Sequence, residues 1–211
     1  MKQKQRFIPA ARISFLTDYF DRFCAIIGLG RKYREKIIRA IGVIRKGSKV
    51  LDAGCGTGSL AIELKNKYNM SKIYGVDIDK KILKIAKKKS IKNKVNIFYQ
   101  QAPLQSMPYP DSYFDVVYSS LVFHHLTTED KITATKEIYR VLRKGGFFIL
   151  ADFGPSKNKF SAVYLWFVVI FEDGYDNYKG FIPKFLRATG FKDIKIVGNY
   201  RFNIDFLRAG K

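Results

Sequence analysis

The stretch VLDAGCGTGSL, residues 50–60, constrains the fold of this chain more than any other feature. It runs from a short apolar segment into a turn with three alternating glycines, Gly54, Gly56 and Gly58. A buried strand that leads through a glycine-rich turn into a helix is typical of nucleotide-binding α/β folds, because the turn brings backbone N–H groups close to a ligand. The polar residues around the turn can therefore indicate which nucleotide it accepts.

Two common nucleotide classes fit this turn poorly. No Gly-Lys-Ser/Thr sequence follows it to place a lysine on a triphosphate, and Ser59 stands where the dinucleotide pattern has its third glycine. Asp52, at the end of the first strand, would repel a pyrophosphate but would attract the α-ammonium and sulfonium of S-adenosylmethionine. The N–H groups of the turn can meet the carboxylate of the same molecule. The turn therefore favours S-adenosylmethionine.

A second carboxylate ends the next predicted strand. Asp77 lies 19 residues beyond Gly58 and can accept both ribose hydroxyls of a nucleoside. Dehydrogenases use the same position, so Asp77 by itself indicates only an adenosine. Ile78 offers an apolar wall for the adenine. Capping of the following helix is the alternative role for Asp77, although Asp79 is better placed for it.

The rest of the chain alternates between strand and helix patterns. Five buried strands are predicted at Lys49–Asp52, Ile73–Asp77, Asn96–Gln100, Phe114–Ser119 and Phe147–Asp152. Amphipathic helices are predicted at Leu60–Tyr68, Lys80–Lys88 and Thr128–Leu142, the last ending at Lys144-Gly145-Gly146. Such alternation indicates right-handed βαβ units. We expect a doubly wound α/β fold with a mainly parallel, seven-stranded, Rossmann-like sheet.

Both ends of the chain depart from this alternation. Two helical patterns between Arg6 and Ile44, broken at residues 28–32, predict an N-terminal helical cover over residues 1–46. The S-adenosylmethionine-binding core then covers residues 47–211 within a single domain. A substrate-lid insertion is expected near residues 155–178, before a helix that ends at Gly190. Strands at Lys192–Val197 and Arg201–Leu207 are expected to form an antiparallel C-terminal hairpin.

Charge and composition limit the class of partner. The 39 Lys and Arg residues against 18 Asp and Glu give a net charge of +21, which attracts nucleic acid or an anionic membrane, or forms a merely solvated basic surface. Two cysteines, Cys24 and Cys55, indicate neither a disulfide framework nor a zinc cluster, and we expect no metal. The start lacks the continuous apolar region of a secretory signal. The most apolar window, residues 160–171, is shorter than the about 20 residues that span a bilayer. We therefore expect a cytoplasmic protein, peripheral at the membrane if associated with it.

Four segments together resemble a known family. In chain order, VLDAGCGTGSLAIEL, YGVDIDKKIL, FDVVYSSLVFHHL and EIYRVLRKGGFFIL are similar to the class I S-adenosylmethionine-dependent methyltransferases. The ubiquinone/menaquinone-biosynthesis and phospholipid N-methyltransferase-like group is the most similar branch. The upstream segment DYFDRFCAIIGLGRKYREKIIRAI resembles the helical cover of those enzymes. The resemblance is specific for the cofactor and says little about the substrate.

The resemblance also implies roles for individual residues. The three glycines of the turn would line the methionine moiety, with Asp52 beside them and Cys55 as a small buried residue of the turn. Gln101 and Ala102 stand where the family has an acidic residue and alanine at the adenine, and the Gln101 amide oxygen can still accept a hydrogen bond. Ser119 and Leu121 would lie beside the sulfonium. S-adenosyl-L-homocysteine would be the product.

The two histidines of the chain are the candidate catalytic groups. His124 and His125 follow the fourth predicted strand, where ligands of such sheets bind. One imidazole could remove a proton from the methyl acceptor, could position a substrate by a hydrogen bond, or could be an ordinary loop residue. The family resemblance favours His125 over His124. It also suggests that Tyr19 closes over the methionine end of the cofactor, although Tyr19 could equally be a core aromatic residue.

The acceptor is less well defined than the cofactor. The segment SSLVFHH lacks the Asn/Asp-Pro-Pro-aromatic motif that orients a nucleic-acid base, which counts against base N-methylation. The aromatic window at 160–171 and the basic segment 25–36 favour a hydrophobic or lipid acceptor at an anionic membrane surface. We expect a phospholipid amine or a quinone-type ring. The alternatives are a small soluble metabolite, RNA, and a noncatalytic cofactor- or nucleic-acid-binding protein.

Overall fold

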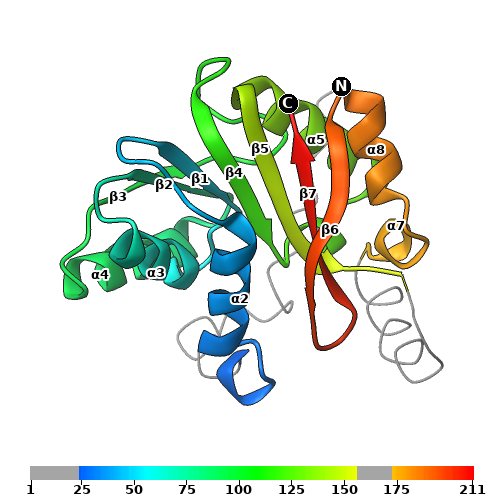
Figure 1. Cartoon of the computed structure of the whole chain (residues 1–211). Helices are drawn as coiled ribbons and strands as arrows, with labels where there is room; N and C mark the ends of the chain where they lie inside the picture. Colours follow the sequence, from blue (N-terminus) through cyan, green and yellow to red (C-terminus); the bar gives the residue numbers. More distant parts are fainter. Residues whose placement is uncertain (1–23, 156–172) are drawn as a thin grey trace, which may run out of the picture.

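The computed structural model describes residues 24–155 and 173–211, and these form one seven-stranded sheet with helices on both faces (Figure 1). The strands are β1 Lys49–Ala53, β2 Lys72–Asp77, β3 Ile97–Gln101, β4 Phe114–Ser120, β5 Leu142–Phe153, β6 Lys192–Tyr200 and β7 Ile204–Gly210. The helices are α2 Arg31–Ile41, α3 Ser59–Lys67, α4 Lys80–Lys92, η3 Phe123–His125, α5 Thr128–Val141, α7 Tyr175–Tyr178 and α8 Ile182–Thr189. The predicted fold class is confirmed.

The order of the strands places the functional edge. The sheet runs β3-β2-β1-β4-β5-β7-β6, with β1 to β5 parallel and β7 antiparallel between β5 and β6. Strands are therefore added on one side of β1 up to β3 and on its other side from β4 onward. Ligands of open α/β sheets bind beyond the carboxyl ends of the strands at such a switch point. The predicted antiparallel hairpin at the C-terminus is also confirmed.

The hydrophobic core lies on both faces of the sheet. Successive residues of β1 point to opposite faces, so that Val50 packs in one cluster with α2 and α3, and Leu51 packs in another with α5 and α8. Burial on both faces explains why these strands read as nearly continuous apolar runs. The core thus fixes the strands whose carboxyl ends carry the predicted site.

The end of α5 differs from the prediction. The helix ends at Val141, and Leu142 already pairs with Phe114 as the first residue of β5. The register then jumps, with Val116 opposite Phe147, so Gly145 and its neighbours form an irregularity within the strand rather than a helix cap. A Cβ atom at Gly146 would lie 2.8 Å from the Asp115 carbonyl oxygen, so the close backbone approach requires glycine there.

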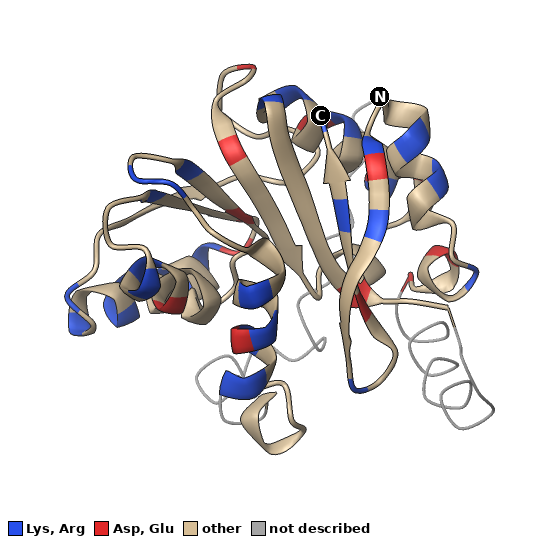
Figure 2. Ribbon diagram, in the orientation of Figure 1, with Lys and Arg blue, Asp and Glu red and all other residues tan. Residues whose placement is uncertain are grey.

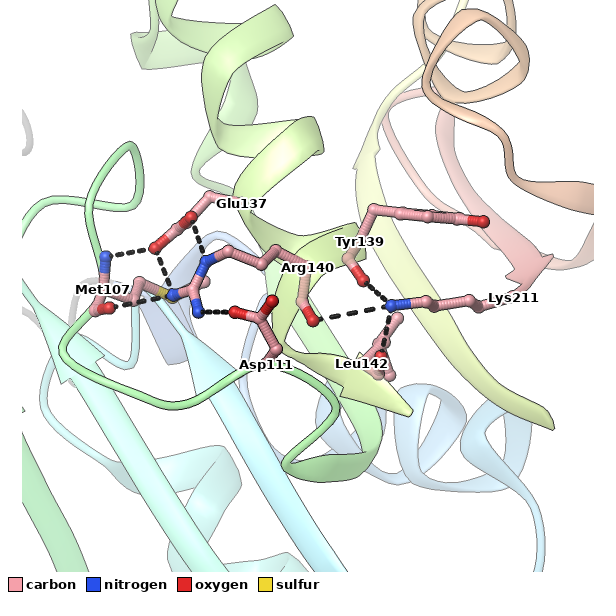
Figure 3. A network of polar contacts seen from close by, with 7 residues as sticks. All are labelled: Met107, Asp111, Glu137, Tyr139, Arg140, Leu142 and Lys211. Carbon is pink, nitrogen blue, oxygen red and sulfur yellow. Dashed lines mark hydrogen bonds and ion pairs between the residues drawn. The ribbon is translucent and has the colours of Figure 1, made fainter. Parts of the chain in front are cut away.

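The carbonyl groups at the end of α5 are capped from the C-terminus of the chain (Figure 3). Lys211 Nζ donates to the carbonyl oxygens of Tyr139 and Leu142, each at 2.6 Å. A cation at a helix C-terminus also interacts favourably with the helix dipole. Arg140 completes this region through Glu137 and Asp111, at 2.7 and 2.6 Å. The helix therefore ends without the glycine cap that the sequence suggested.

Smaller features agree with the sequence where they are described. Gly190 adopts the left-handed conformation, with φ of 110°, at the end of α8. The turn between β6 and β7 lies three residues later than expected, because β6 continues to Tyr200 and β7 begins at Ile204. Tyr19 and the aromatic window at 160–171 lie outside the described residues. In the described ranges, no helix has the length and apolar character needed to cross a membrane.

Candidate functional site

The glycine turn between β1 and α3 has a backbone that only glycine adopts easily. Gly54, Gly56 and Gly58 all have positive φ, at 81°, 51° and 75°. A Cβ atom at Gly54 would lie 2.4 Å from Val122, and one at Gly58 would lie 2.4 Å from the Tyr99 hydroxyl. The turn is therefore a tight cradle that leaves no room for side chains at two of its three glycines.

Asp52 is a buried carboxylate at the carboxyl end of β1. It is 2% exposed and lies opposite Tyr118 of β4 and Gly75 of β2 in the sheet. Burial raises the pKa of Asp52 from 3.8 to about 8, the nearby Tyr118 hydroxyl opposes this rise, and the charge of Asp77 adds to it. The site thus holds a carboxyl group that would ionise when a cation binds beside it.

Asp77, at the end of β2, is held by the backbone on two sides. Its Oδ2 accepts from the Gly56 N–H and its Oδ1 from the Asp79 N–H, both at 2.9 Å. Burial raises the pKa of Asp77, and these N–H groups oppose the rise. A carboxylate has about four acceptor positions, so Asp77 can accept further hydrogen bonds. Asp79 caps α4 by accepting from the Lys81 N–H at 2.7 Å, as expected.

The predicted adenine residues lie next to Asp77. Gln101 of β3 is opposite Asp77 in the sheet, and its Nε2 donates to the Ile78 carbonyl oxygen at 3.1 Å. This bond leaves the amide oxygen as the Gln101 atom that can accept from an adenine amino group. Ile78 is 36% exposed and Ala102 is buried. The structure therefore brings Asp77, Ile78, Gln101 and Ala102 together, while their contact with adenine stays a prediction.

The end of β4 contains the other residues predicted beside the sulfonium. Ser119 is fully buried, and its Oγ donates to the Ala53 carbonyl oxygen at 2.7 Å, which ties β4 to β1. Leu121 has a φ of 57°, an uncommon conformation for a side chain of this size, and its N–H donates to the Ala151 carbonyl oxygen. Cys55 is buried, as predicted, and burial raises its thiol pKa well above the ordinary value. A reactive thiolate is therefore disfavoured there.

The two histidines have different surroundings in η3. His124 is buried, and its Nδ1 lies 2.8 Å from Oδ1 of Asp152, whereas His125 is half-buried. The two imidazole centroids are 3.9 Å apart. Asp152 ends β5 and was not singled out from the sequence, although an Asp directly at the end of a buried strand was the available signal. The structure thus places the carboxylate of Asp152 against His124, whereas the family resemblance favours His125.

The described ion pairs avoid the carboxylates of the cradle. In residues 24–155 and 173–211, no Lys or Arg forms an ion pair with Asp52 or Asp77. This is notable in a chain with 39 basic residues. Together with the glycine cradle, it fits a ligand that brings its own positive charge and an anionic group for the N–H donors of the turn. S-adenosylmethionine has both.

Comparisons with known proteins agree with this geometry. Residues 51–150 match the family described as "Methyltransferase domain". Demethylmenaquinone methyltransferase of Geobacillus sp. (strain WCH70) is 27% identical over 220 residues, covering 92% of each chain. The ubiquinone/menaquinone biosynthesis C-methyltransferase UbiE of Francisella philomiragia is 36% identical over 160 residues, covering 74% of this chain but only 60% of that protein.

A solved structure shows the same fold. Haemonchus contortus phosphoethanolamine N-methyltransferase 2, in complex with S-adenosyl-L-methionine, has a TM-score of 0.67 at 20% identity, over 87% of this chain and 46% of that one. The chain is therefore a methyltransferase that is similar to the class I S-adenosylmethionine-dependent enzymes, whose cofactor is S-adenosylmethionine. Within this class, its aligned relatives carry the names of quinone-biosynthesis C-methyltransferases.

Proposed function

We propose that this methyltransferase acts on a ring carbon of a hydrophobic, quinone-type acceptor. The main support is the alignment with demethylmenaquinone methyltransferase along 92% of both chains. The similarity to phosphoethanolamine N-methyltransferase, at 20% identity, concerns the fold and does not favour an amine acceptor. Of the two acceptors expected from the sequence, the quinone-type ring is therefore the better supported.

Each residue of the proposed site would bind a different part of the cofactor. Asp52 would face its ammonium and sulfonium, and the N–H groups of the glycine turn would face its carboxylate. Asp77 would accept from the ribose hydroxyls, with Ile78, Gln101 and Ala102 around the adenine. Ser119 and Leu121, at the end of β4, complete the wall near the sulfonium. When bound, the cofactor supplies a methyl group on an excellent leaving group.

The chain itself then has two tasks. It holds the acceptor in line with the methyl group and excludes water, which accounts for much of the rate in such displacements. It also removes the proton of the acceptor where the acceptor enters as a phenol. The buried imidazole next to Asp152 is suited to the second task, since a neutral histidine near physiological pH can accept a proton.

We also propose that the enzyme meets its acceptor at an anionic membrane surface facing the cytoplasm. Figure 2 shows that Lys and Arg residues are spread along the ribbon of several helices and strands, including α2. Lys32 and Lys36 are exposed on α2, and Ile26, just before this helix, is 83% exposed. Cations next to an exposed apolar side chain suit the interface of anionic lipids.

The turn between β6 and β7 belongs to the same surface. The Tyr200 hydroxyl donates to the Gly28 carbonyl oxygen at 2.9 Å, which fixes this turn beside the segment before α2. Arg201, in the turn, is exposed. Because Tyr200 pairs with Ile204, and Ile204 with Phe153 at the end of β5, this surface lies at the carboxyl edge of the sheet. A bound membrane would therefore lie close to the proposed site.

Vesicle flotation tests the membrane proposal separately from activity. Lys32→Glu/Arg201→Glu is expected to lose binding to vesicles that contain anionic lipid. Lys192→Glu/Lys195→Glu has the same charge change at the amino edge, where Lys192 pairs with Gly210, and is expected to retain binding. Equal loss in both double variants would show that net charge alone attracts the membrane, and would contradict the proposed surface.

Methyl transfer is tested with methyl-labelled S-adenosylmethionine and defined acceptors. We expect label in the organic extract when reduced demethylmenaquinone with a short prenyl chain is supplied in detergent. Phosphoethanolamine and bulk RNA serve as competing acceptors in parallel reactions. Label transferred to phosphoethanolamine or RNA, with none in the quinol, would overturn the quinone-type proposal and leave the methyltransferase assignment intact.

A further inference from the structure

Asp152 is the most fully engaged carboxylate at the carboxyl edge of the sheet. Its Oδ2 accepts from the N–H groups of Val122 and Phe123, at 3.1 and 2.8 Å. Its Oδ1 accepts from the Phe153 N–H at 2.7 Å and lies 2.8 Å from Nδ1 of His124. Asp152 therefore shapes the loop after β4 and orients one of its imidazoles at the same time.

These contacts determine the charge of Asp152. Burial by itself would raise the pKa of the carboxyl, but His124 and the Phe153 N–H outweigh it and hold the pKa below its ordinary value. An ionised carboxylate can only accept hydrogen bonds, so Nδ1 of His124 must carry the hydrogen. In the neutral ring, Nε2 is then the nitrogen that accepts a proton.

The pair lies next to the cofactor cradle. Val122, whose N–H binds Asp152, is the residue that a Cβ atom at Gly54 would meet at 2.4 Å. The loop that carries His124 therefore contacts the glycine turn directly. His124 is also buried, and the attraction between an imidazolium and a carboxylate is stronger in a buried site than in water. Position and surroundings both suit a proton acceptor.

We propose that Asp152 is a positioning residue that holds His124 in the Nδ1–H tautomer, so that Nε2 of His124 takes the proton of the methyl acceptor. This inference rests on the proposed function, because the methyl acceptor must enter as a phenol whose proton has to be removed. The acceptor O–H bond breaks, its proton forms the Nε2–H bond, and its electron pair makes the ring carbon nucleophilic. Once that carbon carries the methyl group, its C–H proton moves to the ring oxygen, which restores the aromatic ring. The imidazolium, balanced by Asp152, later returns the proton to water.

Other ionisable groups surround this pair. His125, from the same helical turn, lies against His124 with the two ring planes tilted by 41°. From α5 and α7, Lys131 and Asp176 form a buried ion pair at 3.2 Å, which is neutral as a unit. From α2, burial raises the pKa of Tyr33 beyond its usual range, with a smaller contribution from Asp152, so this phenol stays neutral. From β7, the buried Asp205 lies opposite Asp152 in the sheet. Among these groups, Asp152 is the carboxylate whose hydrogen bond to His124 the structure shows.

Imidazole nitrogen NMR on the cofactor-free protein tests the tautomer without any reaction. The chain has two histidines, so an untagged protein gives two imidazole patterns, which His124→Asn and His125→Asn assign. We expect His124 as the Nδ1–H form. In Asp152→Asn, we expect its titration midpoint to fall by about one pH unit or more. Asp115→Asn, at the amino edge, is the matched control and should leave both patterns unchanged. An Nε2–H form of His124 would overturn the proposal.

Kinetics then separate this inference from the proposed function. Once an acceptor that the enzyme methylates is known, the acidic limb of the kcat/KM profile should move to lower pH in Asp152→Asn. The value of kcat should fall more in His124→Asn than in His125→Asn. The opposite order of the two histidine variants would overturn the assignment. If Asp152→Asn does not fold, the wild-type spectrum still shows the tautomer of His124, and the two histidine variants still show which imidazole accepts the proton. Failure of every acceptor would contradict the proposed function, whereas the tautomer stands or falls by NMR.

Discussion

The amino and carboxyl edges of the same sheet hold their polar groups in different ways. At the amino edge, Arg140 is paired with Glu137 and Asp111, and Lys211 caps the end of α5 (Figure 3). At the carboxyl edge, Asp52 is buried with a pKa raised to about 8. Arg140 and Lys211 stabilise the fold through partners within it, whereas Asp52 has no Lys or Arg ion-pair partner in the described part of the chain and can meet a cation that arrives later. The comparison supports the proposed cofactor cradle at the carboxyl edge by an observation other than the sequence motif.

The largest expected effect contrasts one glycine at each edge. Gly54→Ala forces a Cβ atom against Val122 at a φ of 81°, and we expect a loss of about 2–4 kcal/mol in unfolding free energy, together with loss of cofactor binding. Gly145→Ala has a similar φ of 76° with nothing within 4 Å, so the expected loss is about 1–2 kcal/mol. Urea unfolding measures both. Equal losses would show that the cradle is no tighter than a surface turn.

Removal of the ribose carboxylate should act on binding more than on stability. Asp77→Ala is expected to weaken S-adenosylmethionine binding by about 1–3 kcal/mol, the range for hydrogen bonds to charged groups. Asp79→Ala removes the cap of α4 but no proposed ligand contact, so it should cost about 1 kcal/mol of stability at unchanged affinity. Isothermal titration calorimetry compares the two. Unchanged affinity in Asp77→Ala would contradict the placement of the ribose.

The raised pKa of Asp52 gives a pH dependence with a definite sign. Between about pH 4 and pH 8 the folded, cofactor-free protein binds one more proton than the unfolded chain, so its stability falls as pH rises, by up to about 1.4 kcal/mol per pH unit. Cofactor binding should ionise Asp52, release a proton and become tighter from pH 6 to pH 8. The raised pKa of Asp77 acts in the same direction.

Thermal unfolding and calorimetry in two buffers of different ionisation enthalpy measure these effects. Asp52→Asn should remove most of the pH dependence and the proton release. If the variant keeps the wild-type slope, another group is responsible and Asp52 is ionised before the cofactor binds.

The smallest effect is expected at the amino edge. Arg140→Gln breaks partly exposed ion pairs, which contribute up to about 1 kcal/mol, and should leave cofactor affinity unchanged. Chemical unfolding combined with a binding isotherm measures both quantities. A large loss of affinity would mean that the two edges are coupled through α5, contrary to the division drawn above.

Local patterns explain which parts of the site the sequence could predict. The glycine turn, Asp52 and Asp77 all lie at strand ends within one βαβ unit, where spacing alone locates them. Asp152 also lies at a strand end, but its role could not be predicted from spacing, because its partners at residues 122–124 are about thirty positions earlier. The end of α5 was predicted wrongly for the same reason, since Lys211, 69 positions after Leu142, caps the helix.

The most direct test is a crystal structure of the protein with S-adenosyl-L-homocysteine. We predict that the ribose hydroxyls lie within hydrogen-bond distance of the Asp77 carboxylate and that the amino-acid end of the ligand lies against the turn at Gly54. We also predict the ligand ammonium near Asp52. A ligand bound elsewhere, or bound at this edge with its ribose away from Asp77, would contradict this prediction.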